Sequence, residues 1–344
     1  MADPLIFEGR HVLVTGGTGS LGSSMVRRLL AGTDGRPARV TVFSRDEAKQ
    51  HDLRLALRQR GRATDDVIYR DAEELVRFRV GDIRDHRSVR RALAGVDLVV
   101  HAAAMKQVPT CEYAPWEAVR TNVEGAAVLV AEVHEAGTVE AVVGVSTDKA
   151  CLPVNVMGMT KALMERILIE ANLGDGATRF LCVRYGNVLA SRGSVVPMLV
   201  DQLAHGGPLT LTDEGMTRFF LTLDAACDTV VAALTHGEPG EVWVPRVGAA
   251  RMVDVIDAVR GDAPVAVEVT GIRPGEKLHE QMVSDEEALR AVVHEGYGVI
   301  TPLVPELPRR QAPPFGTAWT SARTDLDVAA LRALLARAGV ELGP

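Results

Sequence analysis

The residues best able to do chemistry lie in one segment, STDKACLPVNVMGMTK, which runs from Ser146 to Lys161. A carboxylic acid, Asp148, and an amine, Lys149, are adjacent in it. A carboxyl group and an amine can divide the duties of acid and base when their surroundings move their pKa values apart. The plain alternative is a surface ion pair at the end of a strand. Because Ser146 and Thr147 precede the pair and Lys161 follows it, we favour a catalytic site.

The elements around this pair must present it to a ligand. The apolar run EAVVGVST, from Glu140, predicts a buried strand that ends just before Asp148. Open α/β sheets bind their ligands at the carboxyl ends of their strands, so we expect the pair at a binding edge. For Lys149 to act as a base its pKa must fall, and a desolvated pocket and the charge of Lys161 would each lower it.

Met157 stands one helical turn before Lys161, so the two side chains are expected on the same face of a helix. A thioether has no proton to donate and is not a base. Met157 can therefore fill space in such a site, but another group has to handle any proton there.

Short β-branched runs alternate with longer helical patterns along the first half of the chain, which is typical of a parallel sheet covered by helices. The strand candidates are HVLVT, RVTVFS, RFRVGD, DLVVHAA, EAVVGVST and RFLCVRYG, which begin at His11, Arg39, Arg77, Asp97, Glu140 and Arg179. Their nearly continuous apolar character indicates a sheet that is buried on both faces. We therefore predict an α/β fold with a Rossmann-type, doubly wound parallel sheet.

The alternation stops after Gly186, where short strands, loops and a few helices follow. We assign residues 1–186, with a return segment at about 222–245, to a dinucleotide-binding domain. Residues 187–221 and 246–310 are expected to form a smaller C-terminal substrate-binding lobe. The last part, 311–344, is expected to be a Pro-rich connector and a C-terminal helix, with Thr324 and Asp327 as a weak capping pair before the helix.

The first predicted strand leads directly into the glycine-rich turn TGGTGSLG and then into a helix. Glycines three residues apart let the backbone approach a pyrophosphate at a helix N-terminus, where free N–H groups and the helix dipole favour negative charge. A tight turn without a ligand is the alternative, but the place between a strand and a helix favours a dinucleotide site. The residues assigned to this site are Thr15, Gly16, Gly19, Ser20, Leu21 and Gly22.

The end of the second predicted strand indicates which dinucleotide is bound. An acidic residue there would bind the 2′-hydroxyl of NAD, whereas this chain has Ser44 and Arg45, followed by Lys49. A guanidinium and an ammonium suit a 2′-phosphate, so we favour NADP as the cofactor. The alternative is that both cations are surface charges and that Asp46 binds the ribose.

Two later strand ends are expected to complete the dinucleotide site. Asp82 and Ile83, after the third strand, would flank the adenine. Ala102, Ala103 and Ala104, after the fourth, would pass beneath the nicotinamide ribose.

Composition narrows the possible partners. A net charge of −7 and a pI near 5.8 argue against nucleic acid or an anionic membrane as the main partner, and a solvated helix face explains the basic run Arg54–Arg62 better than a polyanion site. The four cysteines form no CxxC pair and the nine histidines no HExxH or HxH pattern, so we expect no metal site. With neither a signal peptide nor a membrane-spanning run in the sequence, we expect a soluble, cytoplasmic protein.

The order TGGTGSLG, GDIRD, HAAAMKQVP and STDKA, with a downstream lysine, resembles the extended short-chain dehydrogenase/reductase superfamily. The phrases STDKA, NVMGMTK, RYGNVLASRGSVVP, LTDEGMTRFFLT and GIRPGEKLHE are similar to those of the UDP-N-acetylglucosamine 4,6-dehydratases that invert C5. The similarity extends from about residue 7 to residue 335. It implies a single-module form that binds NADP and a UDP-sugar, and a homo-oligomer that pairs through helices near 113–136 and 155–173.

In that family the reaction is an internal redox cycle. Hydride leaves C4 of the sugar, the C5 proton and the C6 hydroxyl are then lost, and hydride returns to C6 while C5 is reprotonated from the opposite face. The resemblance implies that Asp148 is the acid at the C6 oxygen, Lys149 the base at C5, and Lys161 a ligand of the nicotinamide ribose. Met157 holds the place where most relatives have Tyr, although some inverting members carry Met. The acceptor of the C4 hydroxyl proton stays open between Thr147 with a water, Asp148 and Lys149.

The resemblance also implies contacts to the nucleotide sugar, although each of the charged residues alone could be a surface charge. Asn187 would contact the sugar or the diphosphate, and Val196 with Pro197 would lie at the uracil. Arg218 and Arg273 would bind the diphosphate, and Glu276 would bind the uridine ribose. Lys106 is a further candidate near the nicotinamide, and Asn122 is counted with the cofactor-binding residues.

Two other functions compete with this one. The first is a UDP-sugar epimerase, or a dehydratase of another nucleotide sugar, within the same superfamily; the Asp148–Lys149 pair disfavours simple 4-epimerisation, which needs neither a C5 base nor a C6 acid. The second is a non-catalytic dinucleotide sensor, as found among superfamily members without the tyrosine. Retention of Asp148, Lys149 and Lys161 argues against a sensor.

Overall fold

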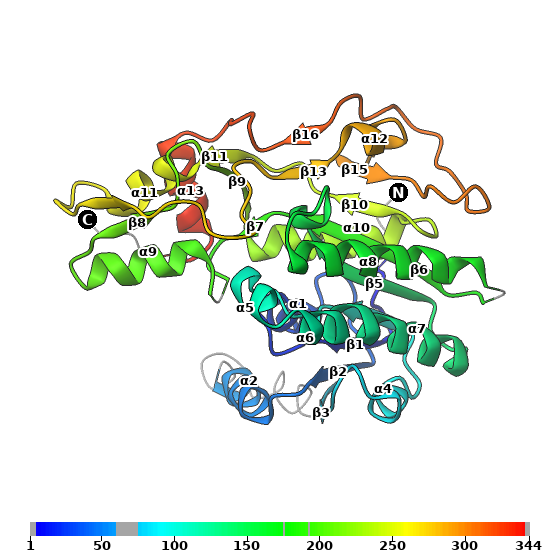
Figure 1. Cartoon of the computed structure of the whole chain (residues 1–344). Helices are drawn as coiled ribbons and strands as arrows, with labels where there is room; N and C mark the ends of the chain where they lie inside the picture. The colour runs from blue at the N-terminus through cyan, green and yellow to red at the C-terminus, as the bar shows by residue number, and fades with distance from the viewer. Residues whose placement is uncertain (1–4, 60–74, 175, 192, 341–344) are drawn as a thin grey trace.

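A large central sheet organises the structure, a computed structural model that describes residues 5–59, 75–174, 176–191 and 193–340 (Figure 1). Its strands lie in the order β14-β15-β10-β6-β5-β4-β1-β2-β3, and those from β10 to β3 pair in parallel. The parallel strands are β1 (His11–Thr15), β2 (Arg39–Ser44), β3 (Val76–Val80), β4 (Leu98–His101), β5 (Ala141–Thr147), β6 (Arg179–Tyr185) and β10 (Val242–Val244). The predicted doubly wound α/β fold is confirmed. Part of the basic run Arg54–Arg62 lies outside the described residues.

The strands are apolar along their length because both faces of the sheet are covered. On β1, Leu13 packs into the core on one face, while Val12 and Val14 pack into the core on the other. The first face is covered by α4 (His86–Ala92), α7 (Gly125–Ala136) and α8 (Val156–Glu170), and the second by α1 (Ser20–Ala31), α2 (Glu47–Gln59) and α10 (Leu223–His236). Two short helices, α5 (Val108–Tyr113) and α6 (Pro115–Val119), lie beside α8.

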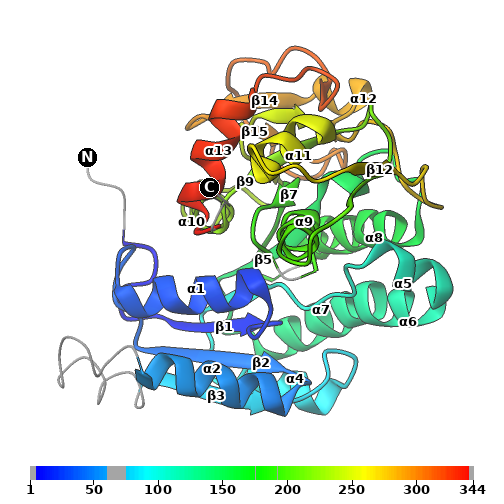
Figure 2. The same ribbon diagram turned by 90° about the vertical axis from the view of Figure 1, so that its left-hand side faces the viewer.

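A smaller lobe at the carboxyl edge of the sheet has a core of its own. It contains a three-stranded sheet of β11 (Ala249–Arg251), β9 (Thr217–Leu221) and β7 (Asn187–Val188), and a pair of β12 (Val267–Val269) with β8 (Leu209–Leu211). Three helices pack on these strands: α9 (Val195–Ala204), α11 (Met252–Arg260) and α13 (Val328–Arg337), and Figure 2 shows α11 and α13 side by side. A further pair, β13 (Gln281–Val283) with β16 (Trp319–Thr320), connects this lobe to the C-terminal segment.

The structure corrects two expectations about the C-terminal third. Residues 291–300, expected in the substrate lobe, form the hairpin β14 (Ala291–His294) and β15 (Tyr297–Ile300), which extends the central sheet by pairing antiparallel with β10. The hairpin buries Val299 and Ile300 against the edge that β10 would otherwise leave open. The helix α12 (Asp285–Ala288) precedes it.

The start of α13 also differs from the expected capping pair. Asp327 is itself the N-cap, and its carboxylate accepts a hydrogen bond from the Ala330 backbone N–H at 2.8 Å. Thr324 lies ahead of the helix and does not cap it. Among the helices that the structure describes, none is long and apolar enough to span a lipid bilayer.

Candidate active site

A cavity of about 1420 Å³ lies where the carboxyl ends of β1, β2, β4, β5 and β6 face the smaller lobe. Pockets for a single small ligand occupy about 300–1,000 Å³, so this one has room for two ligands side by side. Its position, beside the point where the strand order reverses between β1 and β4, is the usual ligand site of doubly wound sheets.

The glycine-rich turn forms one end of the cavity, as predicted. Gly16 has φ +64°, and a Cβ there would lie 2.6 Å from the Ala102 carbonyl oxygen. A Cβ on Gly22 would lie 2.4 Å from the Gly16 carbonyl oxygen, so α1 can approach the turn closely only with glycine at this position. Gly19 caps α1 without a side-chain hydrogen bond, and the first turn of the helix carries no acidic residue. A helix N-terminus that approaches a glycine-rich turn in this way fits the pyrophosphate of a dinucleotide.

The residues after β2 also line the cavity. Lys49 pairs with Asp46, with Nζ 2.8 Å from Oδ2, so the acidic alternative for a ribose contact already has a cation beside it. Arg45 remains 53% exposed at the cavity wall, with Nη1 4.0 Å from Oδ2 of Asp82. Burial acts to raise the pKa of Asp82, but hydrogen bonds from Arg84 outweigh it and hold that pKa below its usual value.

Most of the other expected cofactor contacts line the cavity: Ser20, Leu21, Ser44, Ile83, Ala102, Ala103 and Ala104. Thr15 does not line it. Its hydroxyl instead pairs with Nδ1 of His101 at 2.8 Å and accepts from the Ala103 backbone N–H at 3.3 Å, which ties the ends of β1 and β4 together.

Asn122, which was expected to contact the cofactor, does not line the cavity. Its side-chain amide bonds both backbone groups of Met105, at 2.8 and 3.0 Å, and the Thr160 hydroxyl at 2.9 Å. The neighbouring Thr121 lines the cavity instead, with a buried hydroxyl that has no hydrogen-bond partner in the described part of the chain. Both belong to a π-helical turn, Arg120–Glu124, which the sequence pattern did not reveal.

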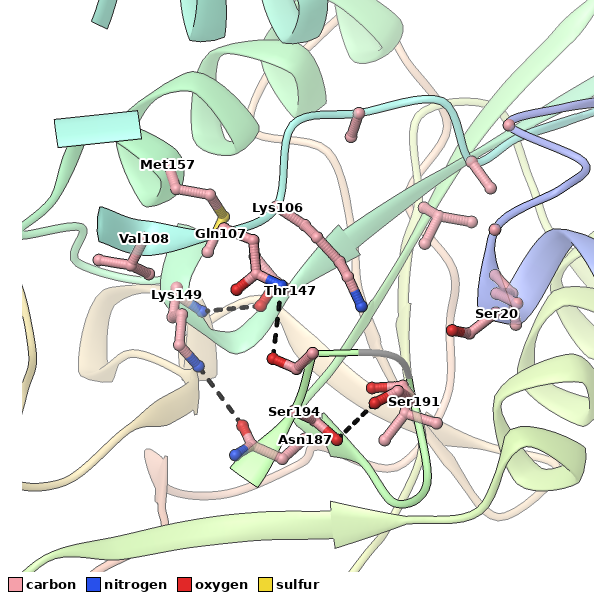
Figure 3. A pocket seen from close by; sticks show the side chains of 18 of the residues that line it. Ser20, Lys106, Gln107, Val108, Thr147, Lys149, Met157, Asn187, Ser191 and Ser194 are labelled. Carbon is pink, nitrogen blue, oxygen red and sulfur yellow. Dashed lines mark hydrogen bonds between the residues drawn. The ribbon is translucent and has the colours of Figure 1, made fainter. Parts of the chain in front are cut away.

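Lys149 lines the cavity and points toward Asn187 (Figure 3). Its Nζ lies 3.1 Å from Asp148 Oδ1, 3.3 Å from Glu280 Oε1 and 3.5 Å from Asn187 Oδ1. Burial acts to lower the pKa of Lys149, but the two carboxylates outweigh it and the pKa lies above its usual value. The expected lowering is therefore wrong: two buried anions beside the amine stabilise its charged form.

Asp148 is fully buried and lies behind the cavity wall rather than in it. Its Oδ1 accepts hydrogen bonds from the Thr147 hydroxyl at 2.9 Å and from Lys149 Nζ at 3.1 Å, and both of those side chains do line the cavity. Its Oδ2 has no hydrogen-bond partner within the residues described. Asp148 is therefore connected to the cavity through Thr147 and Lys149.

Met157 and Lys161 lie on the wall next to the dinucleotide end, both on α8. Met157 is 5% exposed and packs in a small apolar cluster with Cys111 and Ala118. Lys161 is equally buried, and its Nζ lies 3.1 Å from the sulfur of Met164. Burial lowers the pKa of Lys161 to about 8, since a thioether compensates poorly for lost hydration.

The lobe side of the cavity holds most of the expected substrate contacts: Asn187, Pro197, Arg218, Arg273 and Glu276, with Lys106 reaching in from the opposite wall (Figure 3). Arg218 is held by hydrogen bonds from Nη1 to the carbonyls of Thr217 and Leu278, at 2.7 and 3.2 Å. Val196 is the exception. It is 1% exposed and packs into the core of the lobe, because the first turn of α9 points Pro197 and not Val196 toward the cavity.

Several wall residues were not anticipated. Glu280 is the most significant, since it brings a third ionisable group to Lys149. It stands at the end of the phrase RPGEKLHE, which was noted for Arg273 and Glu276 alone. Tyr185 and Gln107 also line the cavity. No cluster of side chains able to hold a metal ion occurs among residues 5–59, 75–174, 176–191 and 193–340.

Comparison with known proteins identifies the family. The profile of the family described as "Polysaccharide biosynthesis protein" matches residues 12–302. The chain belongs to this family. Among curated proteins, it is 40% identical over 292 residues to a protein named UDP-glucose 4-epimerase from Rickettsia conorii, covering 83% of this chain and 81% of that one. It is 39% identical over 307 residues to "Uncharacterized membrane protein MJ1061" from Methanocaldococcus jannaschii, covering 86% and 87%.

Solved structures of similar proteins have the same fold as this chain. The structure of Pen from Bacillus thuringiensis superposes with a TM-score of 0.85 at 30% identity, covering 96% of this chain and 98% of that one. The dTDP-glucose 4,6-dehydratase DesIV from Streptomyces venezuelae, solved with NAD and TYD bound, gives a TM-score of 0.67 at 26% identity, covering 78% and 86%. The fold is thus that of nucleotide-sugar-modifying proteins of the Rossmann type.

Proposed function

We propose that the protein is an NADP-dependent UDP-N-acetylglucosamine 4,6-dehydratase that inverts C5. The observation that carries this proposal is the Asp148–Lys149 pair at the end of β5, with 3.1 Å between carboxylate and ammonium, whose lysine lines the same cavity as the glycine-rich turn. An acid and a base beside a hydride-transfer site are what a dehydration next to a transient ketone requires.

The wall residues divide the work as follows. A bound nicotinamide dinucleotide would accept hydride from the sugar and later return it. Lys149, as the free amine, removes the C5 proton. Thr147 passes its hydroxyl proton to the leaving C6 oxygen and takes a proton back through Asp148 Oδ1, which receives it from the Lys149 ammonium formed when the C5 proton is removed. This relay replaces the direct contact between Asp148 and the sugar, because Asp148 lies behind the wall.

The lobe supplies the contacts for the nucleotide. Arg218 and Arg273 place two cations on the cavity wall, and guanidinium groups suit a diphosphate. Asn187 lies next to Lys149 and is placed to contact the sugar or the diphosphate. Glu276 is assigned to the uridine ribose and Pro197 to the face of the uracil.

NADP is favoured over NAD by the surroundings of Arg45. The neighbouring Asp46 is occupied by Lys49, whereas Arg45 is half exposed at the cavity wall. The guanidinium of Arg45 could bind the 2′-phosphate of NADP. The 2′-hydroxyl of NAD would need a carboxylate, and Asp46 is already paired with a cation.

A second candidate is a UDP-sugar 4-epimerase, favoured by the names of the curated relatives from Rickettsia. Epimerisation at C4 makes no use of a C5 base, so it leaves the Lys149 cluster without a chemical role. A dehydratase that acts on another nucleotide sugar would use the same cluster.

The test is incubation of the purified protein with UDP-N-acetylglucosamine and NADP in D₂O. A 4-keto product, which absorbs in alkali, with deuterium at C5 by NMR is the expected result. Parallel incubation with UDP-glucose covers the epimerase, whose product would be the C4 epimer without C5 deuterium. Dinucleotide binding without turnover of any nucleotide sugar would overturn the proposal and indicate a sensor.

A further inference from the structure

Glu280 is a buried carboxylate on the cavity wall, and one of its two oxygens forms an ion pair with Lys149. It is 1% exposed, and Oε1 lies 3.3 Å from Lys149 Nζ. Oε2 has no hydrogen-bond partner in the part of the chain that the structure describes, although Lys277 Nζ lies 3.8 Å from it. A buried carboxylate oxygen without a hydrogen bond costs free energy, so its retention at this place needs an explanation.

Two hydrogen bonds to Ser321 hold the backbone of Glu280 in place. Its N–H donates to the Ser321 hydroxyl at 2.9 Å, and its carbonyl accepts from the Ser321 N–H at 2.9 Å. Ser321 is fully buried and follows β16, which pairs with β13. The carboxylate is therefore held in front of Lys149 at the start of the β13–β16 pair.

The charges around Lys149 come from several elements. Asp148, in the 3-10 turn after β5, and Glu280, just before β13, face it as anions, while Arg218 on β9 opposes its positive charge. Lys277 faces Glu280 from the far side and donates to the Cys151 carbonyl at 2.7 Å. The two carboxylates are the nearest charges to the amine, and they favour its ammonium form.

We propose that Glu280 is a positioning residue for Lys149: its carboxylate anchors the ammonium at the cavity wall and sets the pH above which Lys149 can act as a base. This inference rests on the proposed function, in which Lys149 takes the C5 proton. The ammonium must first lose one proton to solvent to become the amine, and the amine becomes an ammonium again when it takes the proton from C5. Because Asp148 and Glu280 both pair with this one cation, removal of either carboxylate changes the protonation of Lys149.

The first experiment measures the protonation of Lys149 without turnover. The full-length protein is treated with formaldehyde and cyanoborohydride at a series of pH values, and methylation of Lys149 is quantified by peptide mass spectrometry. In Glu280→Gln the pH of half-maximal labelling should fall by about one to three pH units, the usual effect of one opposite charge at this distance. Glu280→Asp keeps the charge on a shorter side chain, so its pH of half-maximal labelling should lie between those of the wild type and Glu280→Gln. Identical labelling curves for wild type and Glu280→Gln would overturn the proposal.

Glu287→Gln is the matched control. Glu287 is also an ion-paired carboxylate, with a side chain that is 12% exposed, but its partner is Arg184 at 2.8 Å and it does not line the cavity. Its exchange should lower the unfolding temperature and leave the labelling of Lys149 unchanged. A shift as large as that of Glu280→Gln would show a general effect of lost buried charge and would contradict the proposal.

The second experiment follows C5 deuterium incorporation from UDP-N-acetylglucosamine in D₂O against pH. The rate should rise through the titration of Lys149, and in Glu280→Gln this rise should move to lower pH by the same interval as the labelling curve. If the wild type incorporates no deuterium, the proposed function fails, while the labelling curves still decide whether Glu280 controls Lys149. If the wild type turns over and the rise does not move in Glu280→Gln, the inference about Glu280 fails and the proposed function stands.

Discussion

The ammonium of Lys161 lies 3.1 Å from the sulfur of Met164, three residues further along α8. A thioether is a weak acceptor, so this contact replaces little of the hydration that the buried ammonium has lost. The pKa of Lys161 is accordingly lowered to about 8. We expect the cation to be better accommodated when the hydroxyl groups of a ribose lie beside it.

The first prediction is that Lys161→Met stabilises the ligand-free protein. Below pH 8 the amine is charged in both the folded and the unfolded chain, so the full cost of burial applies, roughly 3 kcal/mol for a shift from 10.5 to about 8. Between pH 8 and 10.5 the folded state releases its proton first, so wild-type stability rises with pH and the advantage of the variant shrinks toward zero.

Denaturant unfolding from pH 6 to pH 11 checks this, with Lys49→Met as a control. Lys49 is 54% exposed, and its exchange should change stability by no more than about 0.5 kcal/mol. A Lys161→Met variant that is less stable than wild type at pH 7 would contradict the prediction. Dinucleotide binding should weaken in Lys161→Met even as the ligand-free protein gains stability.

The second prediction separates the proton-transfer residues from Met157. A general acid or base contributes about 10²–10⁴-fold, so Lys149→Ala and Asp148→Asn should each lose activity on that scale while the dinucleotide still binds. Met157→Ala should cost far less in kcat, since the thioether moves no proton. It should instead cost stability, about 2–5 kcal/mol, because Met157 packs against Cys111 and Ala118.

Turnover of UDP-N-acetylglucosamine and thermal unfolding, measured on the same preparations, distinguish the two effects. Met157→Leu keeps the volume and should remain near wild type in both. A loss of kcat in Met157→Leu that equals that of Lys149→Ala would assign Met157 a role in the chemistry and would refute this division.

The parts of the structure that the sequence predicted are those that depend on neighbours along the chain. The strand, glycine turn and helix from His11 to Ala31 are specified by local periodicity and by glycine positions that tolerate no Cβ. The proximity of Lys149 to the dinucleotide end could also be predicted, because parallel strands place their carboxyl ends at one edge.

The parts that could not be predicted depend on contacts between distant segments. Glu280 reaches Lys149 across 131 positions because β13 pairs with β16, and no periodicity encodes that pairing. Thr121 replaces Asn122 at the cavity within a π-helical turn, where the ordinary helical spacing does not apply. The raised pKa of Lys149 follows from Asp148 and Glu280 together, and the sequence placed only Asp148 beside the amine.

The third prediction concerns the choice of dinucleotide. Arg45→Asp should weaken NADP binding by about tenfold or more and leave NAD binding little changed, because only NADP carries a phosphate for this guanidinium. Asp46→Ser is the matched variant. It should leave the affinity for NADP similar, whereas a selective loss of NAD affinity would mean that Asp46 binds the ribose. Equal affinities of the wild type for NAD and NADP, measured by titration calorimetry, would refute the assignment of NADP.

The last prediction is that copies of the chain associate through α5, α6 and α8, which lie together in the structure (Figure 1). These helices expose Tyr113 (92%), Trp116 (69%), Met159 (51%) and Leu163 (49%), and monomeric proteins rarely leave large contiguous apolar patches in contact with water. The superfamily pairing expected from the sequence uses helices near 113–136 and 155–173, which include α6 and α8. Sedimentation at micromolar concentration should give a dimer or a larger oligomer.

The double variant Met159→Glu/Leu163→Glu should dissociate this oligomer by placing unpaired charges in the interface. Leu289→Glu, a change at an 89% exposed leucine that follows α12, should leave the oligomer intact. A monomeric wild type, or dissociation by Leu289→Glu alone, would show that this surface is not the interface.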